Sequence, residues 1–590
     1  MRRSILSVPL AAALTLTAFT GAGVAAAAPA VGPDPGLLPA APVTVSIDAR
    51  APGGAVVPAD YLGLSIEKRV LATTQVDGRI GNIPALLRGL GAGTLRLGGD
   101  SVESTAYLPS AGSSRPSWAQ TVVTPADYDR LATLAQASGW KILLGVNLGR
   151  YDPQRAADEV ATAARILGPS LLAAEVGNEP NAYGQRGLRD PSYGPSDYQA
   201  EFAAYRDAIN AQSPGVPVVG SSAYPPFTNA FDPGFAVPGT FLTQHLYPLN
   251  NCRGDRPTIQ TLTSRTTATR QVSELRQGLA VAAAHGIPLR VSETNSVICS
   301  GTPGVSNTQG AALWSLDYLM QGALLGVAGV NLHGGLQQCT MANPASTSPW
   351  YTPLCAPTPE ALAANQFEAQ PVYYGMQAFK QLVGSTFIPA AYSTRQNVVI
   401  RAARDTTGTV RTVIDDMDLP GSADSLVRLQ LPPGYDEALV SRLQAPSVDA
   451  TTGVTLGGQA VAADGTLAAP VTERVTGRGG VTYVRVSPGS AAVVTLTPRC
   501  TVPSVRGLTL VQAKSRLTAA GCRSGIIAKP RALAKGATLV VQKQKLPAGF
   551  RYRVDQPVHL QLMVKPVPKK KPAPKPATSA PATPPASPAR

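Results

Sequence analysis

Two glutamates follow apolar, strand-like stretches and could carry acid–base chemistry. Glu179 follows Leu-Ala-Ala-Glu-Val-Gly-Asn, and Glu293 follows Pro-Leu-Arg-Val-Ser. A carboxylate at the end of a buried strand is costly unless it has a partner or a chemical role. If both strands belong to one β/α barrel, their carboxyl ends meet at the face where barrel enzymes do their chemistry. The pair therefore predicts an acid/base and a nucleophile, with loop salt bridges or helix capping as the alternative.

Strand-like and helix-like segments alternate between Tyr61 and Phe379, the pattern of a parallel sheet covered by helices. The predicted strands are 61–67, 94–99, 141–149, 172–179, 217–223, 241–248, 288–295 and 329–335. Helical periodicity occurs between them, for example at 125–138, 155–167, 197–212, 271–285 and 307–325. This order predicts a (β/α)8 TIM barrel over residues 45–383, with Glu179 closing the fourth strand and Glu293 the seventh.

After Val383 the sequence changes to short β-branched runs separated by Gly, Pro and Asp. The runs typical of strands are 397–402, 410–415, 425–431, 481–486 and 491–497. They predict an antiparallel β-sandwich over residues 384–498.

Residues 1–28 have the pattern of a secretory signal peptide. Arg2 and Arg3 precede an apolar run from Ile5 to Phe19, and small residues up to Ala28 offer cleavage positions. The alternative is a signal anchor, but the run is short for spanning a bilayer. We therefore expect a secreted protein with no membrane anchor in the mature chain.

An exported chain keeps its cysteines in an oxidising environment, where an even number usually forms disulfides. The six are Cys252, Cys299, Cys339, Cys355, Cys500 and Cys522. None has the spacing of a metal site, and the four histidines are widely separated. We expect disulfides and no dedicated metal ion.

The net charge of +15 belongs to the C-terminus. Residues 499–590 contain 18 Lys or Arg and one acidic residue, Asp555, so the remaining chain has a net charge of −2. Such a region could bind teichoic acids, other anionic polymers or membrane headgroups. Nucleic-acid binding is not expected, because the chain is exported and the tail has no interleaved aromatic residues. Residues 567–590 are rich in Pro, Ala and Lys and are expected to be disordered.

Eight segments in order resemble glycoside hydrolase family 79, the heparanase and β-glucuronidase family. They are YLGLSIE at 61–67, LRLGGD at 95–100, LGVNLG at 144–149, VGNEP at 176–180, HLY at 245–247, SETNS at 292–296, ALW at 312–314 and VYYG at 372–375. The resemblance covers roughly residues 45–498. It implies a retaining glycosidase without cofactor, in which Glu179 is the acid/base, in a less polar setting, and Glu293 the nucleophile. It also implies that residues around Val43–Asp48 join the sandwich.

The resemblance assigns roles to residues beside the two glutamates. Asn178 is expected to bind the sugar 2-hydroxyl, although it could instead cap a turn. Tyr247 is expected to hydrogen-bond the nucleophile, although it could simply be packed. From their position at the ends of the first two strands, Glu67 and Asp100 are also expected to accept hydrogen bonds from sugar hydroxyls, with an ion pair to a barrel arginine such as Arg96 as the alternative.

A uronic carboxylate needs hydroxyl or N–H donors in a confined site. The loop 300–304 after the seventh strand offers N–H groups, and Tyr351, in a stretch resembling the family's Tyr-Ser-Pro, is the best candidate ligand. The sequence departs from some members at Ile298, where a second tyrosine would be favourable, so an acidic substrate is less strongly indicated than glycosidase chemistry. His333 ends the eighth strand and is expected either to line the pocket or to be a satisfied core histidine.

Residues 500–566 resemble a PASTA module, a small bacterial wall-associated domain with a helix on a three-stranded sheet. The matching parts are residues 500–522 and the segment 540–549. The resemblance implies attachment to peptidoglycan, assisted by the basic tail, with a mere spacer as the alternative. Cys500 and Cys522 then form a local staple. By local placement Cys339 should pair with Cys355, which leaves Cys252 to pair with Cys299.

Together these features predict a secreted retaining exo-β-glucuronidase, associated with the cell wall of a Gram-positive bacterium. Its expected partners are a glucuronide-containing carbohydrate and, through the C-terminal module, peptidoglycan or anionic wall polymers. One alternative is a related hydrolase acting on a neutral β-glycoside or internally on a uronic polymer. Another is a non-catalytic wall carbohydrate-binding protein, which the two intact glutamates argue against.

Overall fold

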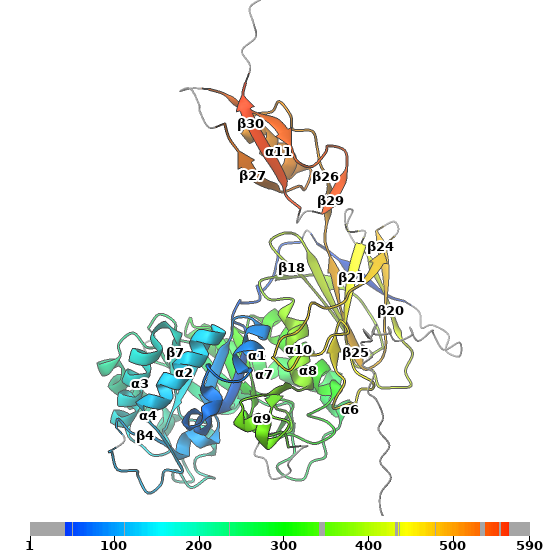
Figure 1. Ribbon diagram of the computed structural model, residues 1–590. Coiled ribbons are helices and arrows are strands. Elements are labelled where there is room, and N and C mark those ends of the chain that lie inside the picture. Colours follow the sequence, from blue (N-terminus) through cyan, green and yellow to red (C-terminus); the bar gives the residue numbers. More distant parts are fainter. Residues whose placement is uncertain are drawn as a thin grey trace, which may run out of the picture. The chain divides into compact units, whose positions relative to one another are not determined.

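The structure is a computed structural model of the 590-residue chain (Figure 1). It describes residues 42–565 except 50, 111, 235–236, 341–347, 431–434, 436, 478–479, 531–536 and 554–555. The signal peptide predicted over 1–28 and the tail predicted over 567–590 lie outside the described residues.

Eight parallel strands close into a barrel in the order β11-β13-β2-β3-β6-β7-β8-β9. Their bounds are β2 Leu62–Glu67, β3 Thr94–Gly98, β6 Lys141–Val146, β7 Leu171–Val176, β8 Val218–Ala223, β9 Leu242–Leu246, β11 Leu289–Thr294 and β13 Gly329–Gly334. Every predicted barrel strand is present. Most strand residues are buried on both faces, which explains why these segments are almost continuously apolar in the sequence.

Helices cover the outside of the barrel (Figure 1). They are α1 Ile83–Leu90, α2 Pro125–Ser138, α3 Pro153–Leu167, α4 Pro195–Gln212, α5 Pro225–Thr228, α6 Ile259–Leu262, α7 Arg265–Ala284, α8 Gln309–Leu325, α9 Pro359–Ala363 and α10 Pro371–Lys380. Local chemistry sets their ends: at α2, Thr124 and Asp127 form a capping box and Gly139 adopts the left-handed conformation after the last turn.

Short strands extend the loops between barrel elements. They are β4 Thr105–Tyr107, β5 Thr121–Val123, β10 Leu249–Asn250, β12 Val297–Ile298, β14 Leu354–Cys355 and β15 Glu368–Ala369. β10 pairs in parallel with β12, so the loops after the sixth and seventh barrel strands lie side by side.

Two sheets pack into the predicted sandwich. One has the order β17-β1-β20-β24, and the other β16-β18-β19-β25-β21-β22, with β23 beside β21. Their strands are β1 Val43–Ile47, β16 Thr386–Ile388, β17 Ala390–Ala391, β18 Val398–Arg404, β19 Val410–Asp416, β20 Ser425–Gln430, β21 Glu437–Gln444, β22 Thr455–Leu456, β23 Glu473–Thr476, β24 Val481–Val486 and β25 Ser490–Leu496. β1 joins this domain, as predicted, but it pairs with β20 in parallel, so the sandwich is not wholly antiparallel.

Apolar side chains from the inner faces of both sheets form the sandwich core, among them Val45, Ile414 and Val494. The larger core runs from the barrel helices to the near face of β25, where Ala491 and Val493 belong to the same cluster as Leu316 and Leu319 of α8. This explains why α8 is buried almost all round. Within the described residues, no helix has both the length and the apolar character needed to cross a membrane.

Residues 499–564 form a small α+β unit with its own core. It contains β26 Arg499–Thr501, α11 Leu510–Ala519, β27 Ser524–Ala528, β28 Leu539–Gln544, β29 Arg551–Arg553 and β30 Val558–Val564. β27, β30 and β28 form a three-stranded sheet, and Leu517 of α11 packs with Leu560 and Leu562 of β30. These are the elements expected of a PASTA module, whose identity here stays a prediction.

Candidate active site

The barrel brings the two predicted catalytic glutamates together. Glu293 lies near the end of β11, and Glu179 lies three residues after β7. A carboxylate oxygen of each and a ring nitrogen of His245 lie within 4.8 Å of one another. Both carboxyl side chains are more than nine-tenths buried. This separation matches the close pair of a retaining glycosidase and is shorter than the roughly 6.5–9.5 Å of inverting enzymes.

Arg96 of β3 is fully buried and organises the base of the site. Its guanidinium forms an ion pair with Glu175 and contacts Glu293 Oε2 at 2.7 Å. It also donates to Asn178 Oδ1 at 2.9 Å. The ion pair considered from the sequence for Arg96, with Glu67 or Asp100, is therefore wrong. The buried Arg96 is occupied by Glu175 and Glu293, whereas Glu67 is the last residue of β2 and Asp100 follows β3.

The Gly-Gly pair after Leu97 makes room for two of these side chains. A Cβ atom on Gly98 would lie 2.2 Å from Arg96 Cζ, so only glycine leaves space for the guanidinium. Gly99 has a φ of 71°, and a Cβ there would lie 2.6 Å from Glu67 Cδ. The LRLGGD segment is thus required by the packing of Arg96 and Glu67.

Glu293 is held in its ionised form. Burial alone would raise its pKa, but His333, His245 and Arg96, together with a hydrogen bond from Tyr247, hold the pKa of Glu293 well below its usual range. The expected hydrogen bond is present, with Tyr247 Oη donating to Glu293 Oε1 at 3.0 Å. A carboxylate that remains ionised is suited to nucleophilic attack.

Glu179 has a different environment. Its backbone is left-handed, with a φ of 51°, and its N–H donates to the Ser222 carbonyl at 2.9 Å. Arg186 donates to Glu179 Oε2 at 2.9 Å, and His245 Nδ1 lies 3.1 Å from Oε1. The less polar setting expected for the acid/base is therefore wrong, because charged or polar groups meet both oxygens.

Hydrogen bonds hold both the backbone and the side chain of Asn178. Its backbone N–H donates to the buried Glu103 carboxylate at 2.8 Å, and its side-chain amide donates to Asp100 Oδ1 at 3.3 Å. Glu103 also accepts hydrogen bonds from the backbone N–H groups of Leu148 and Gly149. Its carboxylate thus ties the loops after the third and fourth barrel strands together. The side chain of Asn178 does not cap a turn, and its role toward a sugar 2-hydroxyl stays a prediction.

Glu67 and Asp100 do form ion pairs, but with arginines outside the barrel strands. Asp100 Oδ1 lies 2.6 Å from Arg186 Nη1, and Glu67 Oε2 lies 3.6 Å from Arg69 Nη1. Arg186 therefore bridges Asp100 and Glu179. Both carboxylates remain at the site, so their proposed binding of sugar hydroxyls stays a prediction.

A cavity of about 310 Å³ adjoins Glu293 and contains three of the predicted substrate-binding residues, Glu67, His333 and Tyr351. Ser300, from the loop proposed to offer N–H groups, also lines it. His333 Nδ1 lies 3.6 Å from Glu293 Oε2, which links this cavity directly to Glu293. His333 also pairs with Ser65 Oγ at 3.0 Å, so it is both a satisfied buried histidine and a cavity residue.

A second cavity has a volume of about 690 Å³. Tyr247, which donates to Glu293, lines it together with Tyr224 and Asn181. Asn181 is two residues beyond Glu179. Tyr224 Oη and Asn181 Oδ1 are buried atoms without a hydrogen-bond partner in the structure. The aromatic rings of Tyr247 and Tyr351 lie 5.9 Å apart, so these two tyrosines stand between the cavities.

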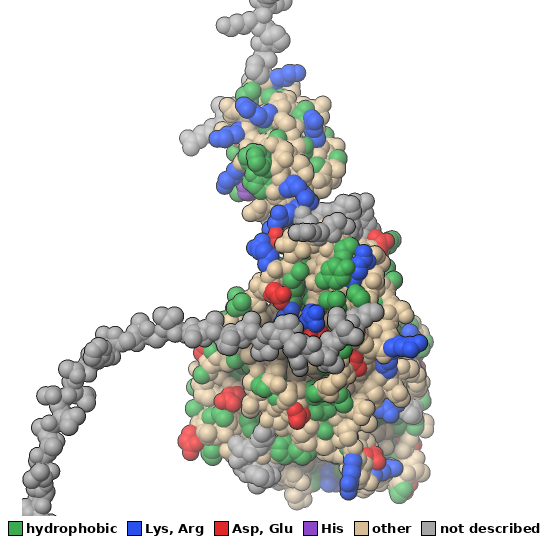
Figure 2. All heavy atoms as spheres, turned by 90° about the vertical axis from the view of Figure 1, so that its right-hand side faces the viewer, with side chains coloured by type: hydrophobic (Ala, Val, Ile, Leu, Met, Phe, Trp, Pro, Cys, Tyr) green, Lys and Arg blue, Asp and Glu red, His purple; other side chains and the backbone are tan. Residues whose placement is uncertain are grey.

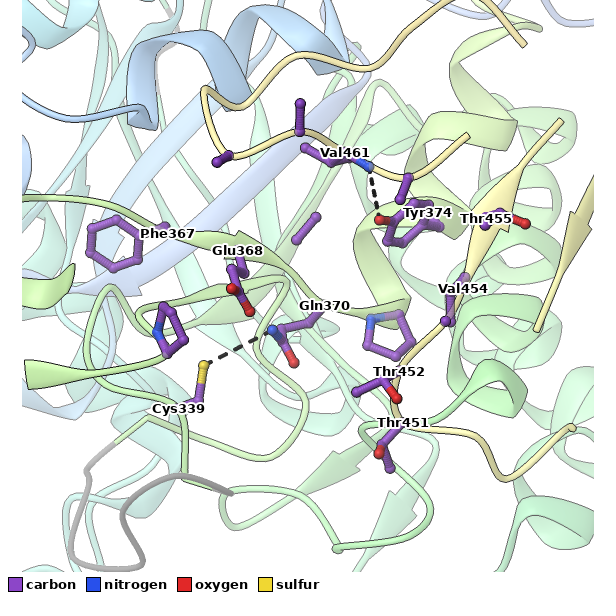
Figure 3. A pocket seen from close by; sticks show the side chains of 17 residues that line it. Cys339, Phe367, Glu368, Gln370, Tyr374, Thr451, Thr452, Val454, Thr455 and Val461 are labelled. Carbon is purple, nitrogen blue, oxygen red and sulfur yellow. Dashed lines mark hydrogen bonds between the residues drawn. The ribbon is translucent and has the colours of Figure 1, made fainter. Parts of the chain in front are cut away.

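A third cavity, of about 450 Å³, is shown in Figure 3. Phe367, Gln370 and Tyr374 line it from the barrel side, and the loop 451–463 of the sandwich completes it. Tyr374 Oη accepts a hydrogen bond from the Val461 N–H at 3.0 Å. Glu368 is the one charged residue among its described lining residues, so this cavity lacks the paired carboxylates of the barrel site.

Glu179, His245 and Glu293 form a possible set of metal ligands by distance alone. Each carboxylate, however, already contacts a guanidinium group, Arg186 at Glu179 and Arg96 at Glu293. A divalent cation placed there would face two fixed positive charges. The donor set therefore does not fit a metal ion.

All three predicted disulfides are present: Cys252–Cys299, Cys339–Cys355 and Cys500–Cys522. The first joins the loop after β10 to the loop after β12. Arg253 and Ile298, each next to one of its cysteines, line the 690 Å³ cavity. This disulfide therefore braces one wall of the site.

Comparisons with known proteins agree with this geometry. Among solved structures, the chain resembles a 4-O-α-L-rhamnosyl-β-D-glucuronidase from Fusarium oxysporum, with a TM-score of 0.62, 20% identity and coverage of 77% of this chain and 100% of that one. It also resembles a GH51 arabinofuranosidase from Xanthomonas axonopodis pv. citri, with a TM-score of 0.55, 14% identity and coverage of 77% and 99%. At these identities the likeness shows the fold, a barrel with a β-sandwich that glycosidases use.

Sequence comparisons find similarity to one glycosidase family. Residues 392–493 match the Glycosyl hydrolase family 79 C-terminal beta domain. A β-glucuronidase from Aspergillus niger is 26% identical over 286 residues, 41% of this chain and 50% of that protein. Another, from Neurospora crassa, is 27% identical over 232 residues, 34% of this chain and 38% of that protein. The chain thus spans half or less of the length of these relatives. The matches show similarity to glycoside hydrolase family 79 and support a glycosidase.

Proposed function

We propose that this chain is a retaining exo-β-glucuronidase. The observation that carries the proposal is the close pair of Glu179 and Glu293, in which Glu293 is bound by Arg96 and Tyr247. The similarity to two β-glucuronidases supports glucuronic acid as the sugar removed.

The reaction proceeds in two displacements. Glu293 attacks the anomeric carbon while Glu179 donates its proton to the departing glycosidic oxygen, which leaves a glucuronosyl ester on Glu293. Glu179, now ionised, takes a proton from water, and that water attacks the anomeric carbon and releases Glu293. Two inversions restore the β configuration. Arg96 and Tyr247 stabilise the carboxylate in the first step and the same carboxylate as leaving group in the second.

We assign the larger cavity to the leaving group from the proposed role of Glu179. The acid must protonate the departing oxygen, so the leaving group lies on the Glu179 side, in the 690 Å³ cavity beside Asn181. The glycone then occupies the 310 Å³ cavity beyond Glu293.

The test is a panel of 4-nitrophenyl β-glycosides followed by trapping. We expect hydrolysis of the glucuronide and little of the glucoside, with β-glucuronic acid as the first product by NMR. A 2-deoxy-2-fluoro glucuronide with a good leaving group should label the peptide that contains Glu293. Initial release of the α anomer, or a label on another residue, would contradict the mechanism.

We also propose that the protein is exported and that residues 499–590 attach it to the cell wall. Figure 2 shows Lys and Arg side chains over the surface of the 499–564 unit, which supports binding to anionic polymers. A chain truncated after Pro498 should hydrolyse the aryl glucuronide at the full-length rate but bind isolated Gram-positive walls less. The binding it loses should be salt-sensitive, because exposed charges are screened above about 0.1 M salt. Unchanged wall binding would refute the attachment role.

A further inference from the structure

The cavity assigned to the glycone has one permanently positive side chain among its described lining residues. Among the described residues that line it, Arg69 is the one Lys or Arg, beside Glu67, Ser300, His333 and Tyr351. Arg69 follows β2 in the short 3-10 helix Lys68–Ala72, and its backbone N–H donates to Ser101 Oγ at 3.1 Å. This hydrogen bond holds the backbone of Arg69 in place, so its side chain extends from a defined position on the cavity wall.

The guanidinium of Arg69 is only loosely held by protein groups. Its side chain is 37% exposed, and Glu67 Oε2 lies 3.6 Å from Nη1, beyond hydrogen-bond range. Glu67 Oε2 is already used by the Ser101 N–H at 2.9 Å. By contrast, the neighbouring Lys68 is fully buried and pairs with Glu159 at 2.8 Å, away from the cavity. Arg69 therefore keeps donors for a ligand.

We propose that Arg69 is a specificity-determining residue that binds the carboxylate of the glycone, with Tyr351 as the second ligand. This inference rests on the proposed function, because it uses the assignment of the smaller cavity to the glycone. A guanidinium matches a carboxylate with two parallel donors, and such charge-assisted bonds are stronger than neutral ones. A neutral hexose has a hydroxymethyl group at that position and gains nothing from a cation there.

If Arg69 had only a structural role, its replacement would change the kinetics of the two substrates in a different way. If Arg69 only orients Glu67, its loss would disturb contacts with ring hydroxyls, which glucuronides and glucosides share. Both substrates would then suffer alike. A carboxylate ligand instead affects the glucuronide alone, and mainly through KM, because the carboxylate is bound equally in the ground state and the transition state.

The experiment compares wild type with Arg69→Gln and Arg69→Lys, and uses Arg79→Gln as the matched control. Arg79 lies in the same connection between β2 and α1, is 66% exposed, pairs with Asp77 at 2.6 Å and does not line the cavity. Binding of free glucuronate and of glucose is measured by calorimetry, and kcat and KM are measured on the 4-nitrophenyl glucuronide and glucoside.

We expect Arg69→Gln to weaken glucuronate binding and to lower kcat/KM for the glucuronide by about 10- to 100-fold, the effect of one charge-assisted hydrogen bond, with KM carrying most of the change. The glucoside should change less than about threefold, and the lysine variant should recover part of the loss. Equal losses on both sugars, or none on glucuronate, would overturn the proposal. Glucuronate binding that depends on Arg69 without any hydrolysis would refute the proposed function and leave the Arg69 assignment supported.

Discussion

The two sides of the catalytic pocket are built differently. On the Glu293 side, the carboxylate lies within strand β11 and is fixed by Arg96, Tyr247 and His333, which come from three other barrel strands or their ends. On the Glu179 side, the carboxyl group lies on a loop with a left-handed backbone, and its partner Arg186 is 31% exposed.

This difference suits the two chemical roles. A nucleophile needs a constant charge and a fixed position, and buried donors supply both. An acid/base must exchange a proton with the leaving group and then with water, so it benefits from a boundary with a more open cavity. In these proposed roles, the Glu293 side is the rigid, charge-defining wall of the pocket, and the Glu179 side is the accessible wall.

The largest expected effect distinguishes the two carboxylates directly. Glu293→Gln should lower kcat on the aryl glucuronide by more than about four orders of magnitude, because it removes the carboxylate proposed to attack the anomeric carbon. Glu179→Gln should lose about 10²- to 10⁴-fold on poor leaving groups, the usual worth of acid catalysis, and less on good ones.

Chemical rescue gives the control. Azide should accelerate Glu179→Ala by attacking the glucuronosyl ester in place of activated water, with a β-glucuronosyl azide as product. It should not restore Glu293→Ala to the same product. Equal losses in both variants across all leaving groups would contradict the two roles.

A smaller effect tests the charge of the rigid wall. Tyr247→Phe removes the hydrogen bond at Glu293 Oε1, so the pKa of Glu293 should rise from its depressed position toward its usual range. Because Glu293 must be ionised to attack, the acid limb of the kcat/KM profile should move to higher pH, with kcat about tenfold lower near neutral pH. Tyr193→Phe, which removes a hydroxyl bonded to Glu201 instead, is the control. An unmoved acid limb would show that Arg96, His333 and His245 keep Glu293 ionised without Tyr247.

The rigid wall is also the part that the sequence predicted best. Parallel strands buried on both faces are apolar runs, so β11 could be located, and with it the carboxylate of Glu293 near its end. The glycines at 98 and 99 stood out as part of a motif, although the reason for them, space for Arg96 and Glu67, required coordinates.

The accessible wall was predicted less well. Arg186 lies in the loop between β7 and α4, which has no periodicity, and its contact with Glu179 depends on how that loop returns to the barrel. The prediction of a less polar environment for Glu179 was wrong for this reason. His245 belongs to a quoted motif, but its contact with Glu179 links two different strands and leaves no local signal. In the sandwich, the sequence analysis did not predict β21, because this strand begins with Glu437 and includes Arg442. Glu437 pairs with Arg474, and Arg442 pairs with Glu473, and these contacts become visible only in the fold.

The smallest effect concerns the disulfide beside the accessible wall. Cys252–Cys299 closes a loop of 47 residues and Cys339–Cys355 one of 16, so a chain-entropy estimate gives about 4 and about 3 kcal/mol for their contributions to stability. Replacing either pair by serine should therefore lower the melting temperature. Only loss of Cys252–Cys299 frees Arg253 and Ile298 on the wall of the 690 Å³ cavity. That variant should raise KM a few-fold for glucuronides with a sugar leaving group while kcat/KM for the small aryl glucuronide stays within about twofold, and the Cys339–Cys355 variant should leave both unchanged. If both variants raised KM for both substrates, the effect would come from general loosening of the barrel loops, and the leaving group would not be bound by the wall that Cys252–Cys299 supports.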